Sequence, residues 1–315
     1  MTTAPRSVLW RRIVENRALY VMMLPGLLFL LVVKYVPMYG LQVAFKDFDP
    51  WVGIWKSEYV GFTYFIQAFK SDIFWRAFNN TLIISLYKWV FGMPMPIILA
   101  ILLNELRVRF LKRIVQSVSY FPHLISWVVI GGLAYSFLGS FGFINQLLQM
   151  LGFGQVIFYQ NPDVWRSILV LTEIWKSVGW GSILYLAALT AVNTDLYEAI
   201  EVDGGGRFAK IWHVDLPTLL PVFAIILILN SSSLIMGNFD QVFALIGNSI
   251  VSPGSLLASK TEILEVYTYR VGLLEGSFSF ASAIGFFQNV LAFIFILGTN
   301  FAAGRIYEDK RYTLF

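Results

Sequence analysis

The sequence contains no cysteine, only two histidines and few charged residues. Without cysteine the chain can form neither a disulfide nor a thiolate metal site, and the distance in sequence between His123 and His213 argues against an imidazole metal site. Charged residues make up 13% of the 315 residues, about half the share found in soluble domains, while 57% are hydrophobic. So few charges cannot cover a soluble surface, and the mean hydropathy of +0.69 agrees. The composition therefore predicts an all-α membrane protein.

Six apolar segments are long enough to cross a bilayer as helices. They lie at about residues 18–40, 78–103, 117–138, 164–191, 217–238 and 278–303. The connections at 139–163 and 239–277 are mixed in polarity, and we expect loops there, with short helices at the membrane interface.

Lysine and arginine are concentrated on one side of this predicted topology. They cluster in an N-terminal arm (1–17), between the second and third spans, after the fourth span and in the tail (304–315). Cytoplasmic loops carry such an excess, so both termini are expected in the cytoplasm. The same distribution explains the net charge of +4 without nucleic-acid binding. Between the arm and the tail we expect a first span with an extracytoplasmic loop (18–75) and a membrane core (76–303).

One polar segment, "YEAIEVDGGGRFAKIWHVDLPTLLP", separates the fourth and fifth spans. Asn193 to Asp195 can cap a first helix, and the glycines after Asp203 can end it, because glycine adopts the positive φ of a helix C-terminus. A second helix is expected from Arg207 to His213, before the span that starts at Leu216. The segment, at about 193–216, is predicted to be a folded cytoplasmic projection that inserts into a partner.

The spacing of this segment resembles the EAA motif of permease subunits of binding-protein-dependent ABC importers. The matching positions are Glu198, Ala199, Asp203, Gly204, Ile211 and Pro217, with Ile200, Gly205 and Ile211 departing from the usual residue types. "NNTLIISL" and "YFPHLISWVV" are similar to stretches of the sugar-importing branch. "KYVPMYGLQVAFKDFDPWVG" and "EIWKSVGWGSILYLAAL" are similar to the subgroup that serves complex or acidic oligosaccharides.

The resemblance implies a maltose-transporter-type permease fold with six spans in the bacterial inner membrane. It implies a non-catalytic subunit that pairs with a second permease, as a heterodimer, and works with two ATP-binding-cassette ATPase subunits and an extracytoplasmic solute-binding protein. It also implies that Glu198 meets a basic residue of an ATPase and that Gly204 forms the break between two coupling helices.

ATP is expected to bind the partner subunits, because the chain has no G-x-x-x-x-G-K-[ST] phosphate loop, and no cofactor is expected in this chain. An intramembrane enzyme lacks any nucleophile–base constellation here. An ion- or proton-coupled secondary transporter is the alternative, although the internal repeats typical of that class are missing.

Polar side chains near the middle of four spans predict a solute path, because such groups are costly in a bilayer. The candidates are Lys88, Glu173, Trp175, Lys176, Trp180, Asn230, Ser231, Gln288 and Asn289. Glu173 and Lys176, one helical turn apart, are able to pair. Trp175 and Trp180 could stack on sugar faces, whereas Ser231 could equally serve helix packing. Two lysines against one glutamate would suit an acidic oligosaccharide such as an oligouronate.

Overall fold

The computed structural model describes residues 14–250 and 255–307. These residues are mostly helical and include a two-stranded antiparallel ribbon of β1 (Lys46–Asp47) and β2 (Glu58–Tyr59). Five helices in the described ranges are long and apolar enough to cross a membrane. Their bounds are Arg17–Phe45, Asp72–Glu105, Trp127–Met150, Arg207–Leu229 and Phe278–Arg305.

The predicted fourth span is present as α10 (Pro162–Thr190), a helix of 29 residues. At 1.5 Å per residue it is about 43 Å long, enough to cross a bilayer. It is not one of the five helices named above, and its central Glu173 and Lys176 lower its hydropathy. The prediction of six spans therefore depends on α10.

The third and fifth predicted spans are interrupted. The segment 117–138 is divided between α7 (Arg109–Leu124) and α8 (Trp127–Leu138), with extended backbone at Ile125. The fifth helix ends with α13 (Leu216–Leu229), and the predicted continuation to residue 238 is wrong. A 3-10 turn, η6 (Ser231–Leu234), follows there, and Gly237 has a φ of +93°.

The region 239–277 has the expected short helices, but several of their side chains are buried in the core of the chain. It contains α14 (Phe239–Ile250), α15 (Ala258–Thr261), α16 (Leu264–Tyr269) and the π-helical turn η7 (Arg270–Leu274). Val242, Leu245 and Ile263 are almost fully buried in one hydrophobic cluster with Trp165 of α10. The apolar side chains lie among polar ones at helical spacing, and a hydropathy pattern alone does not distinguish such a short buried helix from a loop.

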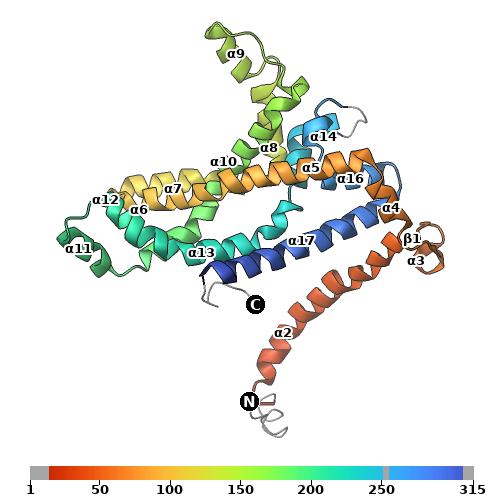
Figure 1. The fold of residues 1–315 in the computed structure, drawn as a ribbon, viewed down its shortest axis with the longest axis horizontal. Coiled ribbons are helices and arrows are strands. Elements are labelled where there is room, and N and C mark those ends of the chain that lie inside the picture. The colour runs from red at the N-terminus through yellow and green to blue at the C-terminus, as the bar shows by residue number, and fades with distance from the viewer. Residues whose placement is uncertain (1–13, 251–254, 308–315) are drawn as a thin grey trace.

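One long helical segment lies along the longest axis of the molecule, and α10 crosses it (Figure 1). This segment consists of α5 (Asp72–Tyr87), the π-turn η3 (Lys88–Gly92) and α6 (Pro94–Glu105). Its α6 part packs against α10 and α13, while α17 (Phe278–Tyr307) contacts α13, η6 and α16. At one end lie α11 (Thr194–Val202) and α12 (Arg207–Lys210). At the other end lie β1, α3 (Gly53–Lys56) and α4 (Thr63–Phe69).

Two peripheral elements extend from this body: α2 (Arg17–Leu30), near the N-terminus, and α9 (Phe143–Met150) (Figure 1). None of the residues of α2 is buried within the chain. A membrane or a partner subunit must therefore cover this apolar helix.

Candidate functional site

A cavity of about 630 Å³ lies among η3, α6, α10, α13 and η6. Four of the predicted path residues line it: Lys88, Glu173, Trp180 and Asn230. Ser233, from the serine run after Asn230, also lines it, as do four polar or aromatic residues that the sequence did not single out: Ser85, Trp89, Ser177 and Asn238. The cavity thus combines two indole rings with hydroxyl, amide and charged groups.

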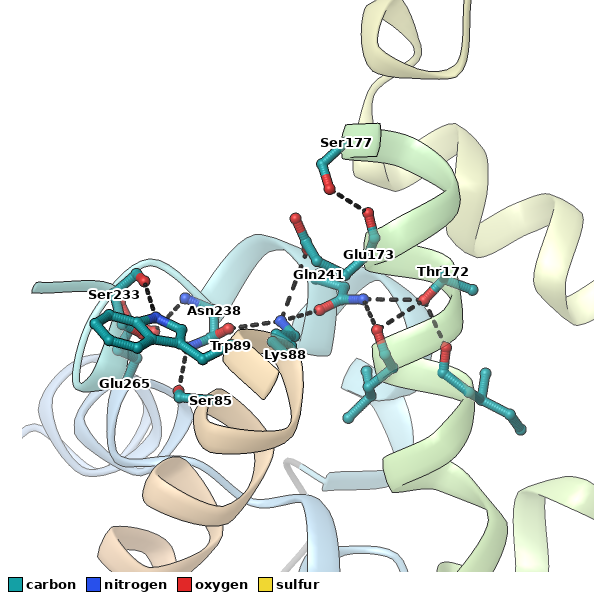
Figure 2. Close-up of polar contacts among 12 residues, drawn as sticks. Ser85, Lys88, Trp89, Thr172, Glu173, Ser177, Ser233, Asn238, Gln241 and Glu265 are labelled. Atoms are coloured by element: carbon teal, nitrogen blue, oxygen red, sulfur yellow. Dashed lines mark hydrogen bonds and ion pairs between the residues drawn. The ribbon is translucent and has the colours of Figure 1, made fainter. Parts of the chain in front are cut away.

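The ammonium group of Lys88 is the centre of a polar network in this region (Figure 2). Its Nζ donates a hydrogen bond to Asn238 Oδ1 at 2.5 Å and another to Gln241 Oε1. Glu173 Oε2 lies 3.7 Å from Nζ, an ion-pair distance longer than a hydrogen bond. The side chain of Lys88 is 10% exposed and that of Glu173 is 32% exposed. Lys88 therefore links three elements, η3, α10 and α14, through one charge.

Both amides that meet Lys88 are held in place by further hydrogen bonds. Gln241 Nε2 donates to Leu169 O at 2.7 Å and to Thr172 Oγ1 at 2.9 Å, which leaves its oxygen for the lysine. Asn238 Nδ2 donates to Ser85 Oγ at 3.0 Å. Because each amide nitrogen already has an acceptor, the orientation of both side chains is fixed by the network.

Glu265 of α16 stabilises the break from which Asn238 projects. Its carboxylate accepts a hydrogen bond from the backbone N–H of Gly237 and from that of Asn238, each at 2.8 Å. The positive φ of Gly237 suits glycine and turns the chain between η6 and α14. The Gly237–Asn238 pair after an apolar run is the sequence signal that could have revealed this turn.

The predicted pairing of Lys176 with Glu173 is wrong. Among the described residues, Glu173 pairs with Lys88, and Lys176 Nζ donates to the carbonyls of Pro122 (3.3 Å), His123 (3.0 Å) and Ile125. A helix end leaves carbonyls without intrahelical partners, and Lys176 satisfies those at the end of α7. The cavity therefore contains one lysine and one glutamate, without the predicted excess of positive charge.

The other predicted path residues lie outside the cavity lining. Ser231 is fully buried and its Oγ donates to Ile228 O at 2.6 Å, in agreement with a packing role. Gln288 is buried beside Thr268, and Asn289 donates to Gly285 O of its own helix at 2.8 Å. Trp175 is 47% exposed on another face of α10. Trp180, in contrast, lines the cavity and stacks on His123, with ring centroids 4.7 Å apart.

The polar segment after α10 has the two helices and the break expected from its sequence. The Asn193 side chain caps α11 by accepting from the N–H of Asp195 at 3.1 Å, and Gly204 has a φ of +78°. The second helix does not stop at His213, since α12 continues through the π-turn η5 (Ile211–Asp215) into α13. Glu198, Ala199, Asp203 and Gly204 are exposed, as is Pro217, while Ile211 packs into a core cluster with Leu219.

Residues 92–297 match the family described as binding-protein-dependent transport system inner membrane component. The chain belongs to that family. Its members are non-catalytic membrane subunits of ABC importers, which agrees with the helical fold and excludes the alternative of an ion-coupled secondary transporter.

Two relatives from Bacillus subtilis cover nearly the whole chain. The chain is 38% identical to Protein LplB over 309 residues, which span 98% of this chain and 95% of LplB. It is 36% identical to the polygalacturonan/rhamnogalacturonan transport system permease protein YteP over 308 residues, or 98% of this chain and 94% of YteP.

A solved structure has the same fold. It is the crystal structure of a bacterial ABC transporter involved in the import of the acidic polysaccharide alginate. One of its chains is 35% identical to this permease, with a TM-score of 0.85, and the match covers 95% of this chain and 99% of that one.

Proposed function

We propose that this permease carries oligosaccharides, with acidic ones as the preferred class, through an ATP-driven importer of the inner membrane. The cavity around Lys88 is the observation that carries the proposal. Trp89 and Trp180 provide aromatic surface for the C–H faces of sugar rings, and Asn230, Ser177 and Ser233 provide hydrogen-bonding groups for hydroxyls. Polar groups concentrated at such a place in a membrane protein are typical of a substrate path.

Acidic oligosaccharides are favoured by the names of the relatives and by the geometry of the Lys88–Glu173 pair. Alginate and polygalacturonan, named for two of the similar proteins, are polymers of sugar acids. Glu173 lies 3.7 Å from the lysine and is partly exposed, so a sugar carboxylate in the cavity could take its place beside Nζ. The preference for acidic sugars thus depends on a sugar carboxylate replacing Glu173 beside Lys88, and it does not require more lysines than glutamates.

Movement through the cavity is coupled, in this proposal, to ATP hydrolysis in partner subunits. Leu196, Val202, Phe208 and Trp212 of the α11–α13 segment are large apolar side chains at least half exposed, which suits insertion into an ATPase cleft. Glu198 is exposed beside them and is available to a basic partner residue. A second permease, two ATPase subunits and a solute-binding protein complete the importer, and ATP binds the ATPase subunits.

Uptake by cells tests the proposal. We expect a host strain that lacks this gene to lose uptake of radiolabelled alginate or galacturonate oligosaccharides, and a plasmid copy to restore it. A neutral oligosaccharide of the same length, assayed in parallel, reports the acidic preference. Unchanged uptake of every oligosaccharide in the deletion strain would contradict the function. If the plasmid copy restored uptake of the neutral oligosaccharide alone, the preference for acidic oligosaccharides would be contradicted but the importer function would not.

A further inference from the structure

The first coupling helix, α11, is joined to the rest of the chain by few side-chain contacts. None of its residues is buried. One contact is the ion pair of Glu201 with Lys210, which joins α11 to α12. Another is the hydrogen bond from Tyr197 Oη to Asp215 Oδ1, which joins α11 to the start of α13 at a distance of 2.6 Å. These two contacts differ greatly in their surroundings.

The Tyr197 contact ends on a fully buried carboxylate. Asp215 has no solvent-exposed surface, and its Oδ2 has no hydrogen-bond partner in the described part of the chain. A carboxylate removed from water is costly unless hydrogen bonds compensate it, so the Tyr197 hydroxyl is of unusual importance to Asp215. The Glu201 carboxylate, in contrast, is 63% exposed, and an ion pair in water contributes little.

The position of Asp215 connects the Tyr197 contact to a membrane helix. Asp215 ends the π-turn η5, and the helix continues from it directly into α13, whose far end at Asn230 lines the cavity. A displacement of α11 therefore reaches α13 through Tyr197 and Asp215 without passing through the glycine-rich turn at Gly204. The pKa of Tyr197 is raised by burial, and further by the Asp215 hydrogen bond, so the hydroxyl keeps its proton and remains a donor.

We propose that the Tyr197–Asp215 hydrogen bond transmits the movement of α11 to α13, which makes Tyr197 a positioning residue for transport. The inference rests on the proposed function, because it assumes that ATPase subunits move α11. It assigns to Tyr197 a role distinct from docking: Glu198 meets the ATPase, and Tyr197 passes the movement on to the membrane helix.

The number of solute molecules transported per ATP hydrolysed measures this transmission. The assembled importer, in proteoliposomes with its solute-binding protein, is supplied with alginate pentasaccharide and, separately, a neutral oligosaccharide. We expect Tyr197→Phe to lower the transport ratio by about fivefold, a typical size for a change in coupling. ATP hydrolysis and the yield of assembled complex should stay close to wild type. A residue with only a structural role would lower yield, hydrolysis and transport together.

Lys210→Gln is the matched control, because it breaks a different link of α11, the ion pair of Glu201 with Lys210. It should leave the transport ratio unchanged. A double variant, Tyr197→Phe with Asp215→Leu, replaces the pair by apolar groups, and its ratio should be no lower than that of Tyr197→Phe, since the two residues act as one unit.

A wild-type transport ratio in Tyr197→Phe, or an equal loss in Lys210→Gln, would overturn the inference. If Tyr197→Phe fails to assemble, the transport ratio of Asp215→Asn is measured instead. In that variant the amide oxygen still accepts the hydrogen bond from Tyr197, but more weakly than the carboxylate does. A reduced ratio in that variant supports transmission and a wild-type ratio rejects it. Failure of the wild-type importer to move either sugar would instead contradict the proposed function.

Discussion

Lys88 Nζ lies 3.7 Å from Glu173 Oε2, across the boundary between η3 and α10 and beside the cavity. The ion pair is looser than the hydrogen bonds of the same ammonium group to the amides of Asn238 and Gln241. The amides fix the position of the lysine, and the carboxylate is the contact that a solute could replace. The positive charge of Lys88 therefore lies at the cavity wall, and the carboxylate of Glu173 balances it.

Lys88→Gln should reduce uptake of an acidic oligosaccharide by roughly tenfold or more, equivalent to about 1.4 kcal/mol. A charge that faces an anion in a low-dielectric cavity acts electrostatically, so the effect on a neutral oligosaccharide should be smaller. Uptake of an oligouronate and of a neutral oligosaccharide is compared at equal membrane levels of the variant.

Lys176→Gln is the matched control for this comparison. Lys176 binds the carbonyls at the end of α7, so its replacement should lower the amount of folded protein and affect both sugars alike. Equal losses for the two sugars in Lys88→Gln would reject the acidic preference, and so would no loss in either.

Glu265→Gln should disturb the cavity from a position outside its lining. A glutamine offers one acceptor oxygen, whereas the carboxylate of Glu265 accepts from the N–H groups of both Gly237 and Asn238. One N–H then faces an amide nitrogen, at a cost of about 1–3 kcal/mol if it stays unpaired. The turn should loosen, and transport should fall for acidic and neutral sugars together.

The control for this variant is Glu275→Gln, which alters a more exposed carboxylate that lies 3.6 Å from Arg270. The initial rate of uptake and the apparent solute affinity are measured for both variants. Wild-type transport in Glu265→Gln, at normal membrane levels, would show that the turn does not need both hydrogen bonds.

The sequence predicted the parts of this molecule that depend on local chemistry. The Asn193 cap, the positive φ of Gly204 and the first, second and sixth spans follow from residue types at fixed spacing. Lys88 and Glu173, which line the cavity, stood out in the sequence because charges within apolar runs are rare. Their partners, however, depend on how separate helices pack.

The partner of Glu173 shows where sequence reasoning fails. Lys176, one turn away on the same helix, was the local choice, but Lys88 on another helix is the actual partner. The broken end of α7, which requires the ammonium group of Lys176, could not be foreseen from an apolar run read as continuous. Asn238 and Gln241 were overlooked for a similar reason, since the break at the end of the predicted fifth span and the helix that follows it were not foreseen.

Gly179→Ala should destabilise the packing of α10 on α7. A Cβ at Gly179 would lie 2.0 Å from the backbone oxygen of Ser119, far closer than any real contact. The two helices must separate, and overpacking of this kind costs about 1–3 kcal/mol. The thermal midpoint of the purified permease in detergent measures the loss. Gly298→Ala, in α17, adds a Cβ with nothing within 4 Å and should not lower the midpoint. Equal midpoints for the two variants would contradict the close approach of the helices.

Glu198→Lys and Gly204→Asp should leave the permease inserted but abolish coupled transport. The first reverses a charge that we expect to face a basic residue of the ATPase. The second puts a side chain at a φ of +78°, which disfavours any residue other than glycine. The ATPase activity of the assembled importer, stimulated by loaded solute-binding protein, is the measurement, and we expect the stimulation to be lost in both variants.

Gly206→Ala is the control, because Gly206 has a φ of −87° and nothing lies within 4 Å of an added Cβ. Full stimulation in Glu198→Lys and Gly204→Asp would reject the role of α11 and α12 as coupling helices. If Gly206→Ala lost as much stimulation as Glu198→Lys and Gly204→Asp, the losses would be due to general disturbance of the segment. They would then not be evidence for a contact of Glu198 or for the backbone conformation of Gly204.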